Sequence, residues 1–354
     1  MFDLKNILRP NIAALIPYSS AREDFKGEAE IFLDANENAL GSATASHALN
    51  RYPDPMQIKV KEKLAKLKGI DPSAIFLGNG SDEAIDILIR AFCNPGKDNI
   101  IILPPTYGMY EVAARINDVV VKAVNLDKNL QLDLPGIDSA IDKNTKLIFV
   151  CSPNNPTGDI ISKSDIEELL KSFNGVIVVD EAYIDFADAE SMLQEIGKYP
   201  NLVVMQTFSK AWGLAGLRVG MAFASNAIIS VMNKIKAPYN VGALAQKLIL
   251  DALDNSNRVS EMASVLKNER KMLAERLPNF SFVKEVLPSS ANFLLVKTNN
   301  PGELYDFLIS HHVVVRNRSS LPLCEGGLRI TVGTPDENKK LLSLLSIFDK
   351  KSNP

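Results

Sequence analysis

The first two thirds of the chain alternate between short apolar runs and longer segments with helical periodicity. The apolar runs are rich in β-branched residues and mostly continuous, which is typical of strands covered on both faces. Amphipathic segments such as 81–93 and 164–173 separate them, and the second opens on Ser164 with Glu167 three residues later, as in a capping box. This rhythm predicts an α/β unit with a mainly parallel, seven-stranded sheet flanked by helices. The expected strands are residues 74–77, 99–103, 119–124, 146–151, 176–180, 202–207 and 217–223.

The pattern changes near residue 241, where longer and more polar helical segments begin. They predict a second, smaller α+β domain. We therefore expect three parts: an N-terminal arm at 1–40 that packs with the small domain, a large domain at 41–245 and a small domain at 246–354. The elements expected in the small domain are helices at 243–277 and 301–311 and strands at 292–297, 313–316 and 327–332.

Composition narrows the classes of partner. The 354 residues are 46% hydrophobic and carry a formal net charge of −3, which argues against the basic surface of a nucleic-acid-binding protein. The first ten residues lack the apolar core of a signal peptide, and no apolar run approaches the roughly 18 residues of a membrane span. Cys93, Cys151 and Cys324 are far apart and lack zinc-ligand spacing, so buried reduced thiols and no metal site are expected. The sequence thus predicts a cytoplasmic protein without nucleic-acid or membrane partners.

Polar residues that could bind a ligand or take part in catalysis stand at the ends of the expected strands, where open α/β sheets bind their ligands. Lys210 follows the strand at 202–207 among apolar neighbours, which predicts an enclosed amine. Asp180 closes the strand at 176–180, and a carboxylate there calls for a cationic partner unless it only caps a helix. Asn155 lies in a turn-rich segment that could be no more than a loop, and Tyr107 could serve in core packing.

A second group of residues fits an anion. Gly80, Ser81 and Asp82 lead from a strand into a helix, where free backbone N–H groups and the helix dipole favour a phosphate. The loop has neither the GK[ST] ending of a P-loop nor the third glycine of a dinucleotide fingerprint. Arg218 could be a solvated charge, but its flanking residues favour a partly buried role. Hydroxyl donors and a guanidinium that could complete the cradle are Thr207, Ser209 and Arg218.

Together these motifs resemble the fold-type I pyridoxal-phosphate aminotransferases over nearly the whole chain, and most closely the branch that acts on histidinol phosphate. Asn-Pro-Thr-Gly at 155–158 and Ser-Lys at 209–210 are typical of the wider family. Arg-Tyr-Pro-Asp at 51–54 and Asp-Glu-Ala-Tyr-Ile-Asp-Phe at 180–186 are more specific to that branch. The resemblance implies the fold of these transferases and pyridoxal 5'-phosphate as cofactor. The matching segments are residues 17–22, 33–38, 51–54, 78–83, 152–158, 179–186, 209–220 and 328–333.

The resemblance also implies a role for each matching residue. Lys210 would bond to the cofactor aldehyde and later act as the base, while Asp180 would keep the pyridine nitrogen protonated. Asn155 and Tyr183 would hold the phenolic oxygen, and Tyr107 would stack on the ring. The residues implied at the cofactor phosphate are Gly80, Ser81, Asp82, Thr207, Ser209 and Arg218.

Substrate and subunit contacts follow from the same resemblance. Tyr52 would reach the cofactor phosphate from the other subunit, which implies a homodimer. Arg329 stands where the family binds a substrate carboxylate through a bidentate guanidinium. Arg316 and Tyr18 are candidates for the substrate phosphate, with a plain surface role as the alternative.

The implied activity is transamination between L-histidinol phosphate and 2-oxoglutarate in histidine biosynthesis. An aminotransferase for aromatic amino acids or a decarboxylase of a phosphorylated amino acid would share every cofactor residue and remains an alternative. A cofactor sensor fused to a DNA-binding module would need a basic helix-turn-helix segment outside the matching region. A structural protein with a decayed site is the third alternative, although every expected site position keeps usable chemistry.

Overall fold

The computed structural model describes residues 2–18, 31–44 and 48–352. Residues 19–30, which include part of the expected arm and of the matching segment 17–22, lie outside the described residues. Seven strands form one sheet in the order β1-β7-β6-β5-β4-β2-β3. The sheet is parallel except for β7, which runs antiparallel to both of its neighbours. The strands are β1 Ile75–Asn79, β2 Asn99–Ile102, β3 Val120–Ala123, β4 Thr145–Cys151, β5 Val176–Asp180, β6 Leu202–Thr207 and β7 Val219–Ala224.

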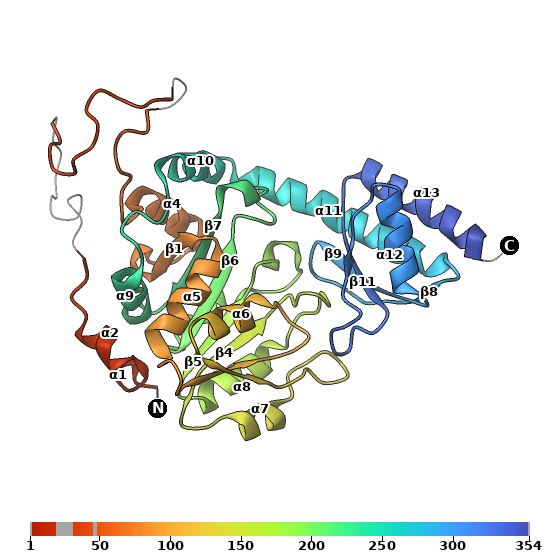
Figure 1. Ribbon diagram of the computed structural model, residues 1–354, viewed down its shortest axis with the longest axis horizontal. Coiled ribbons are helices and arrows are strands. Elements are labelled where there is room, and N and C mark those ends of the chain that lie inside the picture. Colours follow the sequence, from red (N-terminus) through yellow and green to blue (C-terminus); the bar gives the residue numbers. More distant parts are fainter. Residues whose placement is uncertain (1, 19–30, 45–47, 353–354) are drawn as a thin grey trace.

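Helices cover both faces of this sheet (Figure 1). On one face α5, α6 and α9 pack against one hydrophobic cluster, and on the other α4, α7, α8 and α10 contribute to a second. The strand side chains fill both clusters, so β5 is buried at every position. The continuous apolar runs are thereby explained, and the expected α/β fold is confirmed. The helices are α4 Ile58–Lys68, α5 Ser81–Phe92, α6 Met109–Ile116, α7 Leu134–Ala140, α8 Lys163–Ser172, α9 Asn226–Ile235 and α10 Ala243–Asp254.

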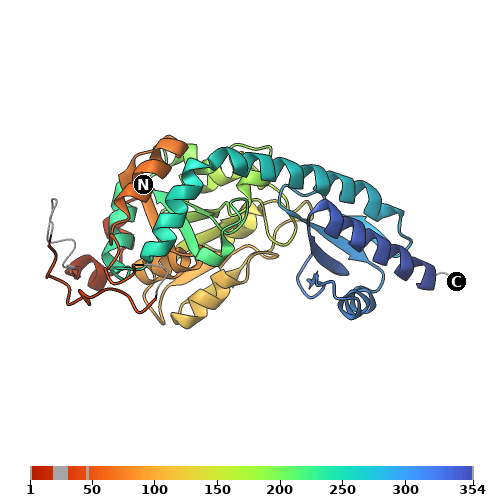
Figure 2. The same cartoon turned by 90° about the horizontal axis from the view of Figure 1, so that it is seen from above.

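A second sheet of four antiparallel strands, in the order β10-β11-β9-β8, forms the smaller unit. The long helix α11 runs from beside the large sheet to this unit, which occupies one end of the molecule (Figures 1 and 2). α11, α12 and α13 share one hydrophobic cluster with the second sheet. The elements are α11 Ser256–Arg276, β8 Val283–Val286, β9 Phe293–Thr298, α12 Pro301–Ser310, β10 Arg316–Asn317, β11 Gly327–Thr331 and α13 Pro335–Ser352.

Several expected boundaries are wrong. The single helix expected at 243–277 is divided at Asn255, whose backbone leaves the helical region and whose side chain donates to the carbonyl of Asp251. Because Ile249 and Leu253 of α10 belong to the core of the large sheet, the change of unit falls after α10 rather than at 245/246. The strand expected at 313–316 begins only at Arg316, since the amide of Val313 still bonds to α12.

The start of α8 also differs from expectation. Ser162, not Ser164, is the N-cap, and its side chain accepts the amide of Asp165. The expected capping box of Ser164 and Glu167 is therefore wrong, because the N-cap lies two residues before Ser164. Ser164 lies in the first turn, where its hydroxyl contacts Ser162 and Asp165. Neighbouring serines make such a shift hard to detect from sequence, because each can cap a helix.

The N-terminal residues pack on the large sheet rather than on the small unit, which corrects the expected position of the arm. Two short helices, α1 Leu4–Ile7 and α2 Pro10–Ala14, lie beside α5 and α9. The Arg9 guanidinium donates to the carbonyl of Arg90 at 2.8 Å, and Ile12 is buried in the adjoining core. This segment therefore satisfies carbonyl groups at the C-terminal end of α5, which helices otherwise leave unpaired.

No helix in the described part of the chain combines the length and apolarity needed to cross a membrane. The thiols of Cys93, Cys151 and Cys324 are free and buried, as expected.

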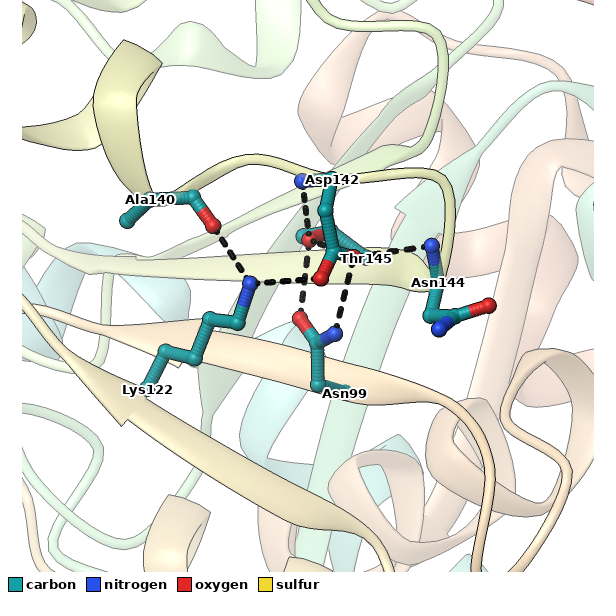
Figure 3. A network of polar contacts seen from close by, with 6 residues as sticks. All are labelled: Asn99, Lys122, Ala140, Asp142, Asn144 and Thr145. Atoms are coloured by element: carbon teal, nitrogen blue, oxygen red, sulfur yellow. Dashed lines mark hydrogen bonds and ion pairs between the residues drawn. The ribbon is translucent and has the colours of Figure 1, made fainter.

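A polar network links neighbouring strands at one edge of the large sheet (Figure 3). It lies far from the carboxyl ends of the strands. Lys122 of β3 donates to the carbonyl of Ala140 at 2.6 Å and to Asp142 Oδ2 at 2.9 Å. Asn99 Nδ2 donates to Asp142 Oδ1 at 3.0 Å, and the Thr145 hydroxyl donates to Asn99 Oδ1 at 2.8 Å. These donors hold the pKa of the Asp142 carboxyl below its usual range. The network ties the edge strand β3 to β2 and to the start of β4.

We expect Lys122→Met to lower the melting temperature by about 2 °C, because an ion pair of this exposure contributes little and only the edge strand depends on it. Differential scanning calorimetry would measure the change. Lys128→Met, at an exposed position of the following loop, is the matched control and should leave the melting temperature unchanged. An equal loss in both variants would contradict the proposed importance of the network.

Candidate active site

A pocket of about 300 Å³ lies where the carboxyl ends of the large-sheet strands meet the second sheet. β4, β5 and β6 bring polar residues to it from one side, and β10 and β11 bring arginines from the other. Most of the residues expected from sequence therefore lie together, since parallel strands present their carboxyl ends at one edge. The expected residues that line the pocket are Ser81, Asp82, Tyr107, Asn155, Asp180, Tyr183, Thr207, Ser209, Lys210, Arg218, Arg316 and Arg329.

Asp180 is the buried carboxylate of the pocket, with only 3% of its surface exposed. Its Oδ2 accepts the hydroxyl of Tyr110 at 2.7 Å, and its Oδ1 accepts the amide of Ala182 at 3.1 Å. Burial raises the pKa of this carboxyl, and the two donors oppose that shift. Asp180 does not cap a helix, because the N-cap of the 3₁₀ turn that follows is Tyr183. The carboxylate is thus desolvated beside a cavity, where a cationic ligand group would stabilise it.

Lys210 is exposed toward the pocket rather than enclosed, which corrects the expectation from its apolar neighbours. Phe208 and Trp212 turn into the core and contact each other edge to face, so the lysine side chain is left on the opposite side. Its Nζ lies 5.4 Å from the ring centroid of Tyr183. Partial burial and then the positive charge of Arg329 lower the pKa of Lys210. A lysine in this state is a better nucleophile and base at neutral pH than a solvated one.

Asn155 links the two sides of the pocket. Its Oδ1 accepts Nη1 of Arg329 at 2.5 Å, and its Nδ2 lies 3.4 Å from the hydroxyl oxygen of Tyr183. Asn155 and Tyr183 are both buried, and burial is the main cause of the raised pKa of Tyr183. The Nε of Arg329 is buried without a hydrogen-bond partner within the described residues. Asn155 is therefore more than a turn former, and Arg329 keeps donor capacity for a ligand.

The residues of the expected anion cradle lie together at the N-terminal end of α5. Gly80 adopts φ +77°, a backbone conformation that favours glycine, and a Cβ atom there would lie 2.8 Å from Arg218 Nη2. Arg218 Nη2 lies 3.5 Å from Asp82 Oδ2, and Nη1 donates weakly to the Ser209 hydroxyl at 3.5 Å. The Arg218 side chain is 51% exposed, which is more than the partly buried role expected for it. Its backbone caps a 3₁₀ turn in a left-handed conformation, and its side chain lines the pocket.

Tyr107 lines the pocket between this cradle and Asp180. Its hydroxyl donates to Asp82 Oδ1 at 3.1 Å, and its ring meets that of Tyr110 edge to face at a centroid distance of 5.5 Å. The residue is half-buried, so core packing accounts for only part of its environment. One side of the ring remains available to a flat ligand.

Tyr18 and Tyr52 do not reach the pocket of their own chain. Tyr18 is 75% exposed and Tyr52 is 51% exposed. The ring of Tyr52 stacks on Tyr239 at a centroid distance of 4.3 Å, and the residue lines a separate surface pocket. A single chain therefore leaves both expected contacts unmade.

Four residues at the site were not expected from sequence: Cys151, Ala182 and Arg318, which line the cavity, and Tyr110, which bonds to Asp180 beneath it. The signal for Arg318 was present, because Arg316 and Arg318 are two residues apart and extended backbone places such residues on one face. Tyr110 carried no signal, since an aromatic residue on an amphipathic helix is usually part of the core.

Comparisons with known proteins identify the family of the chain. The family model "Aminotransferase class I and II" matches residues 24–345. A histidinol-phosphate aminotransferase from Cytophaga hutchinsonii is 53% identical over 98% of this chain and 99% of its own. One from Parabacteroides distasonis is 50% identical, again over 98% of this chain and 99% of its own.

A solved structure extends the comparison to the fold. The histidinol-phosphate aminotransferase from Clostridium acetobutylicum is 28% identical, with a TM-score of 0.79 over 86% of this chain and 92% of that one. The resemblance drawn from the motifs is confirmed, as is the fold class that it implied. The chain belongs to the class I and II aminotransferases and, within them, to the histidinol-phosphate aminotransferases.

Proposed function

We propose that the protein transfers the amino group between L-histidinol phosphate and 2-oxoglutarate, giving imidazole-acetol phosphate and L-glutamate in histidine biosynthesis. The observation that carries this proposal is one pocket in which Lys210 and the buried Asp180 face a group of three arginines. The first two residues suit amino-group chemistry, and the arginines suit substrates that carry phosphate or two carboxylates. The near-full-length similarity to histidinol-phosphate aminotransferases supports the same substrate.

Pyridoxal 5'-phosphate is the cofactor of this family, and the residues of the pocket fit it. The desolvated carboxylate of Asp180 suits a protonated pyridine nitrogen, which would offset the burial that raises its pKa. The Gly80 backbone, the N-terminal end of α5 and the guanidinium of Arg218 suit a phosphate dianion. When bound, the cofactor supplies an aldehyde that bonds to amines and a ring that withdraws electrons from the substrate's α-carbon.

The proposed work of the chain centres on Lys210. Its Nζ would be the base that takes the proton from the substrate α-carbon and returns it to the former aldehyde carbon of the cofactor. Burial and Arg329 lower the pKa of Lys210, so more of the amine is neutral and able to accept a proton at neutral pH. Asn155 and Tyr183, whose polar atoms lie 3.4 Å apart, orient the cofactor through its phenolic oxygen.

The three arginines are proposed to bind the anionic end of each substrate. Arg316 of β10 is paired in register with Arg329 of β11, and Arg318 follows Arg316 on the same edge. The Nε atoms of Arg318 and Arg329 are buried and unpartnered within the described residues. A guanidinium with an unsatisfied N–H group favours an incoming anion, because the ligand can supply the missing acceptor and an opposite charge.

We expect Arg316→Gln and Arg318→Gln each to raise KM for histidinol phosphate about tenfold, because each removes a charge-assisted contact to the substrate phosphate. KM for the dephosphorylated analogue histidinol should change little, since it lacks the anion. Steady-state kinetics with both amines would measure this difference. Arg258→Gln, on the exposed surface of α11, is the matched control. Equal changes in KM for both amines would count against a phosphate contact.

We also propose that the protein is a homodimer in which Tyr52 contacts the cofactor phosphate of its partner. Tyr52, Leu49 and Leu244 are exposed around the second pocket, which suits burial at a subunit contact. Light scattering would test the assembly. Mixing subunits of Lys210→Ala with subunits of Tyr52→Ala should restore activity, because one site of a mixed dimer then keeps both residues. No recovery in a mixture shown to contain mixed dimers would refute the shared site.

The substrate assignment itself is tested by kcat/KM for histidinol phosphate, phenylalanine and threonine phosphate, measured in parallel. A preference for phenylalanine or threonine phosphate would replace the proposal with an aromatic aminotransferase or a phospho-amino-acid decarboxylase.

Tyr18 is a further proposed contact to the substrate phosphate, and its exposed ring requires the bound state or the dimer to bring it there. We also propose that the protein is located in the cytoplasm, and cell fractionation would test this.

A further inference from the structure

Tyr110 occupies an unusual position directly beneath the pocket. It is the second residue of α6 and is fully buried. Its ring stacks on Phe149 of β4 at a centroid distance of 4.7 Å and an interplanar angle of 15°. Tyr107 meets the same ring edge to face at 84°. The ring is therefore held by Phe149 and Tyr107 together, and its hydroxyl has one well-defined direction.

That direction is toward Asp180. The Tyr110 hydroxyl donates to Asp180 Oδ2 at 2.7 Å, and the Ala182 amide donates to Oδ1 at 3.1 Å. Each carboxylate oxygen thus has one protein donor and a free lone pair. The two bonds fix the carboxylate plane and favour its ionised form against the effect of burial.

Packing alone does not explain a tyrosine here. Phenylalanine would make the same aromatic contacts with Phe149 and Tyr107, and it would avoid the cost of burying a hydroxyl group. The hydroxyl is compensated because its acceptor is the buried carboxylate that lines the pocket. A hydrogen bond to a charged group is also stronger than one between neutral groups.

We propose that Tyr110 is a positioning residue whose hydroxyl holds the Asp180 carboxylate in the orientation and ionised form that the cofactor's pyridine nitrogen requires. The inference rests on the proposed function. It adds a residue that does not line the pocket and acts through Asp180. Without this donor the Asp180 carboxylate would be more basic and would draw the proton away from the pyridine nitrogen. The ring would then withdraw electrons from the substrate less strongly.

The test is Tyr110→Phe, which keeps the ring and removes the hydroxyl. We expect kcat to fall roughly tenfold, as for the loss of one hydrogen bond to a charged group, with KM changed less than about twofold. The first readout needs no substrate: the ¹⁵N NMR shift of ¹⁵N-labelled pyridoxal 5'-phosphate should move toward that of an unprotonated pyridine. Tyr199→Phe is the matched control, because Tyr199 is also a buried tyrosine but lies outside the pocket.

A double-mutant cycle separates positioning from general destabilisation. In an Asp180→Asn background, Tyr110→Phe should reduce kcat less than twofold further, since the negative charge that the hydroxyl stabilises is already gone. A full tenfold loss in that background, or an unchanged ¹⁵N shift in the single variant, would overturn the proposal. If Tyr110→Phe fails to fold, 3-fluorotyrosine at position 110 provides the second variant. Its more acidic hydroxyl should move the ¹⁵N shift in the opposite direction, and an unchanged shift would also overturn the proposal.

The ¹⁵N measurement also distinguishes the two proposals. If the wild-type protein bound cofactor but did not transaminate histidinol phosphate, the proposed function would fail while the shift still tested Tyr110. If the protein transaminated normally and the shift did not respond, only the assignment of Tyr110 would fail.

Discussion

Replacing Lys210 with alanine is expected to lower kcat by about 10⁴-fold, the largest effect of any substitution in the protein. Lys210 is the lysine that lines the pocket, and its Nζ is placed beside Tyr183 and within the field of Arg329. Alanine removes the proposed attachment point of the cofactor and the proposed base at once. Water in the enlarged pocket cannot replace a positioned amine, because it is both a weaker base and unoriented.

Borohydride reduction followed by intact mass measurement would test the attachment independently of activity. The wild-type protein should gain one reduced cofactor, and Lys210→Ala should gain none. Lys271→Ala, on the exposed surface of α11, should behave as wild type in both assays. A variant at position 210 that kept kcat within tenfold of wild type would remove the chemical basis of the proposed function.

Asp180→Asn is expected to have the second largest effect, a fall in kcat of about 10³-fold with little change in KM. The amide keeps the shape of the side chain and can still accept the Tyr110 hydroxyl, but it lacks the charge that pairs with a protonated pyridine nitrogen. Electrostatic stabilisation in a buried site is strong because water does not screen it. The cofactor should also stabilise this variant less, so the rise in melting temperature on adding pyridoxal 5'-phosphate should shrink.

Glu181→Gln is the matched control for Asp180→Asn. Glu181 is the next residue, is equally buried and also has a carboxyl whose pKa burial raises. Its carboxylate points away from the pocket, where it accepts the amide of Met192 at 2.6 Å and a donor from Gln206 at 3.0 Å. Glu181→Gln should therefore leave the cofactor-induced rise in melting temperature intact. A loss of that rise in both variants would mean that any buried charge change at this strand end disturbs the pocket.

The sequence alone was sufficient to locate most strands of the large sheet. The boundaries of β5 and β6 match expectation residue for residue, because a strand covered on both faces is mostly apolar and becomes polar at its end. It did not reveal that β7 runs antiparallel at an inner position of the sheet. Direction depends on which strand edges pair, and the side-chain pattern of a buried strand is the same in both directions.

The site shows the same division. Lys210, Asp180 and Asn155 could be identified because their chemistry is unusual for their surroundings and each follows an apolar strand. Tyr110 could not, since its hydrophobic setting concealed a hydroxyl that meets Asp180 across 70 residues of sequence. The exposure of Lys210 and Arg218 was also misjudged, because neighbours along the chain do not reveal which way a side chain turns.

By itself, then, the amino-acid sequence determined the α/β class, the places of the strands and the chemical groups available at their ends. These are local properties, set by periodicity, turn formers and residue type. The tertiary structure alone decided which of those groups meet: the carboxylate of Asp180 with the hydroxyl of Tyr110, and the guanidinium of Arg329 with Asn155 from the other sheet. Such contacts join segments far apart along the chain, and they depend on how the two sheets pack rather than on any pattern within one segment.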